Sequence, residues 1–378
     1  MSKINVCCVG IGTIGGGVSE LLYKNKYKGI SLYAICDKDD NKLNKLDFDV
    51  IRYNDFNDVL NDQNINLIVE TMGGDEPAFT LIKKALEKGI NVVSANKEVV
   101  AKHYQELSEL LKKSKAKFLF EASVGGVVPI VNSIYNYQRA NDIYKIEGII
   151  NGSTNYLLTL MQEDGIDYLD AIEDAKKRGF LESDPSSDLK GLDMKRKISI
   201  LSDIAFHTNI DIDEVYNYSL EGVTDAFIEE LELNDYYLKY MAEANKVGKT
   251  LQIRIEPVAV KINSLLAKIA YERNYIAFFG KTQEKVELLG LGAGRYPTST
   301  AIISDIIQIA SKSPKMDLNT KNKLKIDNSK LMDSYIIDGD IDNKLIDHKM
   351  GKLVVTKKIS WMELNKNLSK INFYARIK

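Results

Sequence analysis

Residues 4–22 read INVCCVGIGTIGGGVSELL, and this stretch sets the architecture of the first third of the chain. Residues 4–9 are mostly apolar and predict a buried strand, whereas Val18, Leu21 and Leu22 follow a helical pattern. Between them, GIGTIG carries glycine where a turn must be tight, where a ligand approaches the backbone and where the helix packs on the strand. This order predicts a dinucleotide-binding turn with contacts from Gly10, Gly12, Thr13, Ile14 and Gly15.

An acidic residue follows the second strand expected in this region. Residues 30–36 are largely apolar and lead to Asp37. A carboxylate at this distance from the glycine turn normally bonds the ribose 2′-hydroxyl and favours NAD. Lys38 comes next, with Lys42 and Lys45 nearby, and their ammonium groups could meet the 2′-phosphate of NADP. The sequence therefore leaves NAD and NADP both open, with Asp37 favouring NAD.

Strands and helices continue to alternate up to about residue 130. Strands are expected over residues 67–70, 91–94 and 118–121, with helices such as 78–88 between them. Parallel strands need such helical crossovers, so this part is predicted to be a doubly wound, Rossmann-type sheet. Its ligands belong at the carboxyl ends of the strands, where the chain has Glu70, Thr71, Ala95, Lys97 and Glu121.

The bulk composition argues against several classes of function. With 378 residues, the chain is too long for one ordinary core, so two or three domains are expected. A formal net charge of -2 gives no support to binding of nucleic acid or of a membrane surface. No apolar run approaches the ~20 residues of a membrane span. The three cysteines form no metal or disulfide pattern, which suits a reducing cytoplasm.

Residues 179–197, GFLESDPSSDLKGLDMKRK, form the second distinctive stretch. A loop rich in carboxylates is expected to lead into a helix, because a proline and two glycines interrupt only its first part. Asp193 and Lys197 are four apart and share one face of that helix. Such a pair is usually a surface salt bridge. Together with Glu182 and Asp188, it also fits the seat of a substrate that carries an ammonium group.

The rest of the chain lacks regular alternation. Several strands are expected without helices between them, which predicts a second, mixed sheet. These strands are expected near residues 145–150, 251–255, 258–262, 276–279 and 286–289. NGSTNY at 151–156 reads as a turn into a helix that Ser153 or Thr154 could cap. Further on, a helix is expected over about 298–311, and Lys, Asn and Asp then dominate to about residue 332, as in a linker.

Several of these stretches occur together, in the same order, in one known family. The chain resembles homoserine dehydrogenase over about residues 4–310. The matching pieces are GIGTIG (10–15), ETMGG (70–74), SANK (94–97), EASVGG (121–126), NGSTNY (151–156), residues 179–197, and GAG (292–294) with Pro297 and Thr298. Each piece is weak alone, but their joint order is highly specific.

The resemblance implies NAD(P)-dependent interconversion of L-homoserine and L-aspartate 4-semialdehyde, a step towards threonine, methionine and isoleucine. It implies Lys197 as the general acid/base. The substrate-binding carboxylates that it implies are Glu182, Asp188 and Asp193. The cofactor contacts that it implies beyond the glycine turn are Thr71, Lys97, Gly179 and Gly294. A site for a monovalent cation, sodium or potassium, is implied at Glu121, Val124, Gly126 and Val128.

The expected fold class is α/β. A Rossmann-type NAD(P)-binding domain would span residues 1–130, with helix 298–311 packing back on it. Residues 131–297 would form an α+β dimerisation and substrate-binding domain with a mixed sheet, and residues 312–378 a linker and a small C-terminal extension. The resemblance implies a homodimer formed through the middle sheet.

Three features depart from the family pattern. Cys36 stands where members often have arginine, so the cofactor preference stays open. GFLE at 179–182 replaces the usual Gly-Tyr-Ala-Glu. Residues 333–378 are too short for the regulatory ACT domain of long members, so feedback inhibition by threonine is not predicted.

Other readings remain open on the residues alone. A semialdehyde dehydrogenase that makes an acyl phosphate would need an activated cysteine, whereas Cys7, Cys8 and Cys36 fall in or at the end of expected strands. A non-enzymatic, Rossmann-type redox sensor would not need residues 179–197. Another hydroxy-amino-acid dehydrogenase would share most of these features, and only substrate profiling would distinguish it.

Overall fold

The computed structural model describes residues 3–311 and 313–378, and the chain divides into two compact units. The first unit comprises Met1–Ala140, Ser199–Asn209 and Leu291–Asn322. The second comprises Asn141–Ile198, Ile210–Gly290 and Lys323–Lys378. The division after Ala140 falls later than the expected boundary at residue 130, and a short internal segment returns to the first unit.

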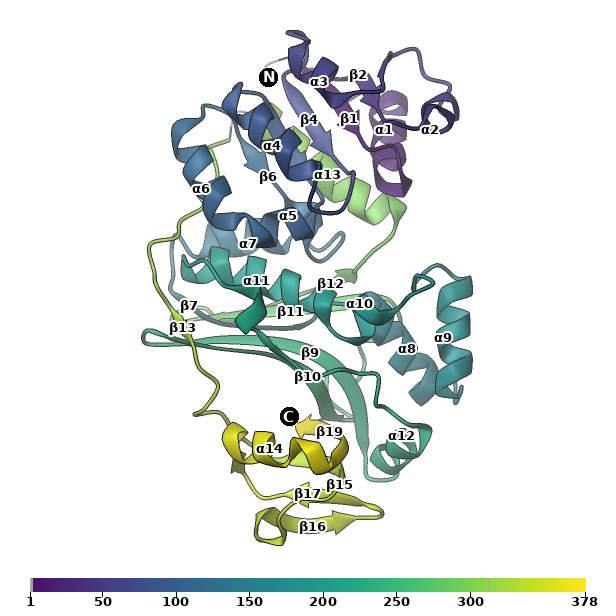
Figure 1. Cartoon of the computed structure of the whole chain (residues 1–378), viewed down its shortest axis with the longest axis vertical. Helices are drawn as coiled ribbons and strands as arrows, with labels where there is room; N and C mark the ends of the chain where they lie inside the picture. The colour runs from purple at the N-terminus through teal and green to yellow at the C-terminus, as the bar shows by residue number, and fades with distance from the viewer. Residues whose placement is uncertain (1–2, 312) are drawn as a thin grey trace. The chain divides into compact units, whose positions relative to one another are not determined.

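The first unit contains a six-stranded parallel sheet in the order β3-β2-β1-β4-β5-β6 (Figure 1). Its strands are β1 (Ile4–Val9), β2 (Ile30–Cys36), β3 (Ile51–Tyr53), β4 (Leu67–Glu70), β5 (Asn91–Ser94) and β6 (Phe118–Leu119). Its helices are α1 (Thr13–Lys24), α2 (Asp40–Asn44), α3 (Phe56–Asn61), α4 (Ala78–Glu87), α5 (Lys97–Lys102), α6 (Tyr104–Lys113), α7 (Ile130–Tyr137) and α13 (Arg295–Ala310). The strand order reverses next to β1, so the predicted Rossmann-type class is confirmed.

Helix α13 packs on α1 through small residues. A Cβ atom at Gly17 would lie 2.6 Å from Ser299 Oγ and 2.9 Å from Arg295 Cγ, so only glycine permits this approach. Arg295 also pairs with Glu20 of α1, at 2.9 Å between Nη2 and Oε2. The helix begins at Arg295, before the expected residue 298, and it lies against α1 although it is distant in sequence.

The second unit is built on an eleven-stranded mixed sheet. Its main path runs β12-β11-β7-β9-β10-β19-β15-β17-β16, and β8 and β13 also pair with β10. The strands are β7 (Ile143–Ile149), β8 (Tyr216–Asn217), β9 (Tyr236–Val247), β10 (Thr250–Lys261), β11 (Arg273–Gly280), β12 (Glu284–Leu291), β13 (Lys325–Ile326), β15 (Tyr335–Gly339), β16 (Ile346–Met350), β17 (Leu353–Thr356) and β19 (Ile371–Ile377). A two-stranded sheet pairs β14 (Met332–Asp333) with β18 (Ile359–Ser360).

Most helices of the second unit lie between residues 152 and 206, and two come later. The first group is α8 (Gly152–Glu163), α9 (Tyr168–Lys177), α10 (Ser186–Leu189) and the start of α11 (Leu192–Phe206), and the later two are α12 (Asp225–Glu232) and α14 (Trp361–Asn367). The expected helix after residue 191 therefore exists as α11. Figure 1 shows α8 and α9 side by side, in agreement with their contacts.

Strands β9 and β10 differ most from the expectation. They pair antiparallel along their whole length, from Thr250–Val247 to Lys261–Tyr236. Two strands, at residues 251–255 and 258–262, were expected in place of β10, and Pro257, which lacks the N–H group that a strand uses, lies between them. In the structure Pro257 lies between the part of β10 that pairs with β8 and the part that pairs with β19, so no parallel partner requires its N–H. Strand β9 was not predicted, because buried polar residues such as Lys239 and Glu243 obscure its apolar pattern.

The C-terminal segment joins the second sheet. Arg376 and Ile377 of β19 pair in parallel with Val258 and Ala259 of β10, and β19 pairs antiparallel with β15 on its other side. Residues 323–378 were expected as the end of a linker and an extension of unknown role. They instead continue the mixed sheet, because β10 is long enough to offer a free edge beyond β8.

Buried ion pairs connect the strands at this junction. Arg376 Nε lies 2.6 Å from Glu256 Oε1, and Arg254 Nη1 lies 2.7 Å from Asp333 Oδ2. Both arginines also pair with Glu243. Arg376 is 5% exposed and Glu256 is 1% exposed, so each charge depends on its partner for compensation.

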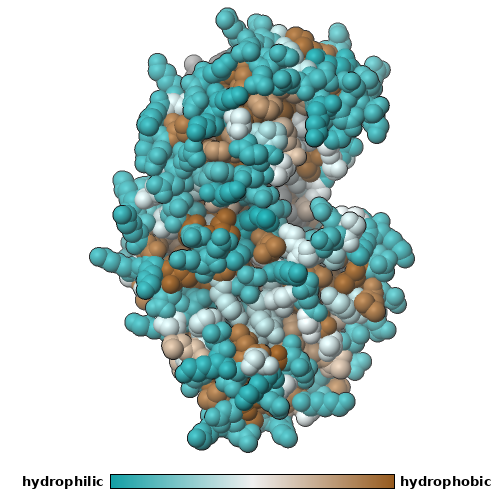
Figure 2. Space-filling view, viewed as in Figure 1, coloured by the Kyte–Doolittle hydropathy of each residue, from teal (hydrophilic) through white to brown (hydrophobic). Residues whose placement is uncertain are grey.

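No helix within residues 3–311 and 313–378 is long and apolar enough to cross a membrane. On the face drawn in Figure 2, hydrophobic residues appear in small groups among hydrophilic ones. Scattered apolar residues of this kind are ordinary for a water-exposed surface.

Replacing Arg376 by methionine should leave Glu256 buried without its closest cation. We expect the free energy of unfolding at neutral pH to fall by about 3–5 kcal/mol, the usual cost of breaking a buried pair. Denaturant unfolding followed by circular dichroism measures this change. Lys281→Met is the control, because Lys281 and Asp142 are both more than two-thirds exposed and should lose under ~1 kcal/mol. An equally small loss for both variants would contradict the assigned role of Arg376.

Candidate active site

The glycine turn between β1 and α1 depends on close backbone contacts. Gly10 has φ +92°, and a Cβ atom there would lie 2.7 Å from the backbone nitrogen of Met72. At Gly15 a Cβ atom would lie 2.0 Å from the Gly10 carbonyl oxygen. Gly12 differs, since a Cβ atom there would meet no atom within 4 Å. The turn therefore needs glycine at positions 10 and 15 for its own packing, whereas space remains open in front of Gly12.

Helix α1 begins at this turn without a side-chain cap. Gly12 is its N-cap residue and has no side chain with which to accept a hydrogen bond from the first turn. Free N–H groups and the positive end of the helix dipole at such a terminus bind phosphate well. Thr13 and Ile14 belong to this first turn, so the structure places all five predicted contacts of the turn together.

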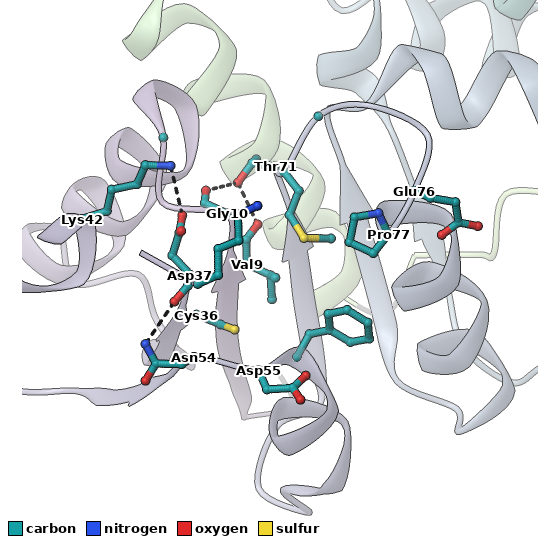
Figure 3. A pocket seen from close by; sticks show the side chains of 15 residues that line it. Val9, Gly10, Cys36, Asp37, Lys42, Asn54, Asp55, Thr71, Glu76 and Pro77 are labelled. Atoms are coloured by element: carbon teal, nitrogen blue, oxygen red, sulfur yellow. Dashed lines mark hydrogen bonds and ion pairs between the residues drawn. The ribbon is translucent and has the colours of Figure 1, made fainter. Parts of the chain in front are cut away.

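A cavity of about 450 Å³ lies in front of the turn (Figure 3). Its lining comes from the ends of β1, β2 and β4 and from the segments that follow β3 and β4. The lining residues are Val9, Gly10, Gly12, Cys36, Asp37, Lys38, Lys42, Asn54, Asp55, Phe56, Thr71, Met72, Gly73, Glu76 and Pro77. Thr71 contributes to the wall and donates a hydrogen bond from Oγ1 to the Gly10 carbonyl at 2.8 Å. The predicted residues Asp37 and Thr71 thus share one cavity with the glycine turn.

Asp37 is held in place by the backbone and by a lysine. Its Oδ2 accepts a hydrogen bond from Ile11 N at 2.7 Å, and its Oδ1 accepts one from Asp39 N at 3.0 Å. Lys42 Nζ lies 3.6 Å from Asp37 Oδ2, and Figure 3 shows this ion pair at the side of the cavity. Lys38 lines the same cavity. Acidic and basic groups therefore occur at the same place, as the sequence indicated.

The loops after β4 and β5 are held together by a buried carboxylate. Glu70 accepts hydrogen bonds from Met72 N at 2.8 Å and from Ser94 Oγ at 2.6 Å. Burial raises the pKa of this glutamate above its ordinary value. Asn96 donates to the Gly74 carbonyl at 2.7 Å and caps α5, whose first residue is the half-buried Lys97. Glu70 thus supports the segment that carries Lys97, and it does not line the cavity.

In the second unit, the second distinctive stretch gives a compact buried group. Lys197 Nζ lies 2.7 Å from Asp193 Oδ2 and donates a hydrogen bond to the Ile150 carbonyl at 2.9 Å. Asn151 Nδ2 donates to Asp193 Oδ2 at 2.8 Å and to Asp188 Oδ1 at 2.6 Å. Lys197 is 9% exposed and Asp193 4% exposed, so this pair is not the surface salt bridge that its spacing alone would suggest. The structure brings three of the predicted residues together.

Two predicted residues of the same stretch lie apart from this group. Glu182 is exposed and makes no hydrogen bond or ion pair within the described part of the chain. Gly179 has φ +77° and ends α9, with its N–H donating to the Lys176 carbonyl at 3.0 Å. Glycine is the usual residue after a helix in this conformation, so its backbone role is clear. A contact of Gly179 or Glu182 with a ligand remains a prediction.

The segment after β6 places the predicted cation ligands in a buried turn. A Cβ atom at Gly126 would lie 2.5 Å from the Leu291 carbonyl oxygen, so glycine permits this turn to approach the segment that leads to Gly294. Glu121 accepts hydrogen bonds from Val131 N and Asn132 N, each at 2.8 Å, at the start of α7. Val124 and Val128 are also buried. No cluster of three or more histidine, cysteine or acidic side chains suited to a metal occurs in the described residues, so a cation here would depend on carbonyl oxygens.

A second carboxylate lies beside Glu121. Asp305 of α13 accepts a hydrogen bond from Glu121 N at 2.9 Å. Burial raises the pKa of Glu121 to about 7, and burial together with the charge of Glu121 raises the pKa of Asp305 to about 8. A bound cation would favour the ionised forms of both groups. The residues therefore fit the expected cation site.

Comparison with known proteins identifies the family. The sequence model described as homoserine dehydrogenase matches residues 129–307, and the model of the homoserine dehydrogenase NAD-binding domain matches residues 10–121. A homoserine dehydrogenase of Helicobacter pylori is 31% identical over 331 residues, covering 86% of this chain and 78% of that protein. The Bacillus subtilis enzyme is 29% identical and covers 82% of this chain and 73% of that protein. This chain belongs to the homoserine dehydrogenase family.

Solved structures of homoserine dehydrogenases share the fold. One from Thiobacillus denitrificans has a TM-score of 0.90 at 24% identity and covers 99% of this chain and 98% of its own. A hyperthermophilic archaeal homoserine dehydrogenase in complex with NADPH has a TM-score of 0.71 at 27% identity, with 83% of this chain and 99% of that chain covered. The family consists of NAD(P)-dependent oxidoreductases, and the glycine turn and cavity of the first unit fit such a cofactor.

Two contributions to these sites were missed in the sequence. Ser153 or Thr154 was expected to cap α8, but Asn151 is its N-cap residue and accepts from Thr154 N. Nothing local in the sequence reveals that the Asn151 amide also reaches two carboxylates. Asp305 could have been recognised as a buried carboxylate, because it is the one acid within the apolar run AIISDIIQIA. A charge at such a position is rarely buried without a partner.

Replacing Gly12 by alanine separates folding from cofactor binding. The variant should keep the parental unfolding midpoint, because the methyl group meets no protein atom. It should bind NADH at least about tenfold more weakly, equivalent to a loss of about 1.4 kcal/mol, because the methyl group occupies the space that the pyrophosphate needs. Fluorescence titration with NADH measures the affinity. Gly15→Ala should instead destabilise the fold, and an unchanged NADH affinity in Gly12→Ala would contradict the assignment of the turn.

Stability should fall as the pH rises from about 6 to about 9. The folded chain holds protons on Glu121 and Asp305 up to pKa values of about 7 and about 8, whereas the unfolded chain releases them at ordinary acidic pKa values. Because the folded state binds more protons in this range, raising the pH favours unfolding. Asp305→Asn should weaken this dependence, and exposed Asp49→Asn should not. Thermal unfolding across this pH range, in buffers without sodium or potassium, measures it, and identical curves for all three proteins would contradict it.

Proposed function

We propose that this protein catalyses the NAD(P)-dependent interconversion of L-homoserine and L-aspartate 4-semialdehyde, with Lys197 as the general acid/base. The observation that supports it best is the buried Asp193–Lys197 pair in a chain whose other unit has a dinucleotide-binding turn and cavity. The membership of the homoserine dehydrogenase family gives the substrate. The reaction would serve the synthesis of threonine, methionine and isoleucine in the cytoplasm.

Lys197 is arranged to exchange a proton with a substrate oxygen. A protonated lysine has three N–H donors. Asp193 and the Ile150 carbonyl take two of them, which leaves one for the oxygen on C4 of the substrate. During aldehyde reduction this ammonium would donate its proton to the forming alkoxide. During alcohol oxidation neutral Lys197 would accept the hydroxyl proton, so oxidation should be favoured at alkaline pH.

Other residues would hold the two reactants. The bound nicotinamide supplies or accepts the hydride. The first turn of α1, with Gly10, Gly12, Thr13, Ile14 and Gly15, would bind the cofactor pyrophosphate. Thr71, Lys97, Gly179 and Gly294 are the further cofactor contacts that we propose. The α-ammonium of homoserine would bind among the carboxylates of residues 182–193.

The residues at the end of β2 do not exclude either NAD or NADP. Asp37 would bond the 2′-hydroxyl of NAD, and its carboxylate would repel a 2′-phosphate. Lys42 partly offsets that repulsion, because it lies 3.6 Å from Asp37. We therefore propose that NAD is preferred and that NADP is also accepted.

Assembly and ion binding complete the proposal. We propose a homodimer formed through the sheet of the second unit, and a sodium or potassium ion bound near Glu121, Val124, Gly126 and Val128. Carbonyl oxygens suit such a hard cation. Size-exclusion chromatography with light scattering tests the dimer, and activity in sodium, potassium or choline chloride tests the ion.

Thiol chemistry is disfavoured as an alternative. Cys7, Cys8 and Cys36 are buried. Burial raises the pKa of Cys8 and of Cys36 to about 12, so neither is an activated nucleophile. The experiment that tests the function is the appearance of reduced nicotinamide when the protein is given L-homoserine with NAD⁺ or NADP⁺ at alkaline pH. Other hydroxy amino acids should react much more slowly, and a faster reaction with one of them would replace homoserine as the substrate.

Replacing Lys197 by methionine should remove the acid/base and little else. We expect kcat for homoserine oxidation to fall by about 10²–10⁴, the usual contribution of such a group. Steady-state kinetics with saturating cofactor measures it. Lys195→Met, two residues away on the same helix, is the control and should keep parental kcat. A Lys197 variant within about tenfold of the parent would rule out this role, and Glu182→Gln should mainly raise KM if Glu182 binds the substrate.

A further inference from the structure

Asn151 makes hydrogen bonds with both ends of its side-chain amide. Its Oδ1 accepts from Thr154 N at 2.8 Å and from Thr154 Oγ1 at 2.9 Å, which caps α8. Its Nδ2 donates to Asp188 Oδ1 and to Asp193 Oδ2. The orientation of the amide is thus determined, because carboxylates accept only and a backbone N–H donates only. Asn151 is 3% exposed, so water does not substitute for these partners.

The two carboxylates come from different helices. Asp188 belongs to α10 and Asp193 to α11, yet one nitrogen atom bonds an oxygen of each. Like charges at this separation repel, and burial strengthens the repulsion. The amide N–H groups of Asn151 offset it, so this residue holds Asp188 and Asp193 together.

The same amide competes with Lys197 for one oxygen atom. Asp193 Oδ2 accepts the Asn151 amide at 2.8 Å and pairs with Lys197 Nζ at 2.7 Å. A hydrogen bond to a carboxylate draws off part of the charge that would otherwise act on the ammonium. Asn151 therefore moderates the strength of the Asp193–Lys197 pair.

We propose that Asn151 is a positioning residue that keeps Asp188 and Asp193 in place and sets the pH at which Lys197 loses its proton. This inference rests on the proposed function for its kinetic consequence, although its geometry does not. Asn151 would then have a second role in addition to capping α8.

The groups around Lys197 decide the sign of the effect. The charged neighbours in this cluster are Asp193 on α11 and Asp188 on α10. The ends of β7 and β11 contribute neutral groups, the Ile150 carbonyl and the Asn274 amide, which donates to that carbonyl at 3.3 Å. Without the Asn151 amide, the negative charge on Asp193 acts more fully on Lys197. The ammonium form is then favoured, and Lys197 should lose its proton at a higher pH.

Serine and aspartate at position 151 separate the two roles of the residue. Both are good N-cap residues, so α8 keeps its cap. Asn151→Ser loses the donors to the carboxylates, whereas Asn151→Asp replaces them by a third carboxylate. Asn155→Ser is the matched control, because Asn155 Nδ2 donates only to carbonyls, among them those of Ile269 and Tyr271 at 3.0 and 2.8 Å.

The experiment is the pH dependence of kcat/KM for homoserine oxidation. In Asn151→Ser the acidic limb should move up by about half a unit to one unit, and the alkaline plateau should fall as well, because Asp188 and Asp193 are held less well for the substrate. Asn151→Asp should move it further in the same direction. Asn155→Ser should lower stability and leave the limb in place. A uniform loss of rate in Asn151→Ser, with no shift of the limb, would overturn the proposal, because a merely structural role has that result.

A second measurement does not depend on the reaction. Competitive labelling with acetic anhydride, followed by mass spectrometry of the peptide that contains Lys197, reports the pH at which this amine becomes neutral. The labelling midpoint should rise in Asn151→Ser and not in Asn155→Ser. If the parent fails to oxidise homoserine but the midpoint rises, the proposed function is wrong and the role of Asn151 stands. An unchanged midpoint overturns the role of Asn151 whether or not the parent is active.

Discussion

A buried ammonium group must have a negative partner, and the candidate site of the second unit follows from that constraint. Lys197 is 9% exposed, so removing it from water is costly unless Asp193 compensates it. Asp193 is buried as well, and its Oδ2 also accepts a hydrogen bond from Asn151 Nδ2. The Ile150 carbonyl at the end of β7 accepts a further N–H of Lys197. The Ile150 carbonyl, Asn151 and Asp193 together determine the position of the Lys197 ammonium. A lysine held in this way can exchange a proton with a substrate atom.

The first unit depends on a different constraint, the close approach of backbone to backbone. Gly10 and Gly15 allow the turn after β1 to pack against Thr71, Met72 and the turn itself. Gly126 allows the turn after Glu121 to approach Leu291 and Gly292. A side chain at any of these places would separate the segments. Gly12, in contrast to Gly10 and Gly15 of the same turn, has space in front of it, and that space lies where the N–H groups of α1 are free. The space suited to a phosphate group therefore lies at Gly12, where close packing does not fill it.

Compensation of buried charge recurs away from these sites. Arg254 and Arg376 are nearly inaccessible and share the carboxylates of Glu243 and Glu256 across β9, β10 and β19. This network joins the C-terminal strands to the central strands of the second sheet. Glu121 and Asp305 show the opposite case, two neighbouring buried acids whose pKa values are raised. The first arrangement compensates the buried charges with one another, whereas in the second burial favours the protonated acids.

The sequence by itself determined the α/β class, the glycine turn between β1 and α1, the place of Asp37 after β2 and the i,i+4 spacing of Asp193 and Lys197, because each depends on local spacing or on a turn that needs glycine. Strand β9, the continuous strand β10 and the pairing of the C-terminal strands with the second sheet were not predicted. Pairing partners distant in the chain decide whether polar residues or Pro257 can lie in a strand. The burial of Lys197 and the contacts of Asn151 were equally hidden. An i,i+4 pair has the same spacing on a surface as in a core, and only packing of β7, α8, α10 and α11 removes it from water. The order of residues is enough to predict local turns and spacings, whereas burial and long-range hydrogen bonds form only when the chain folds.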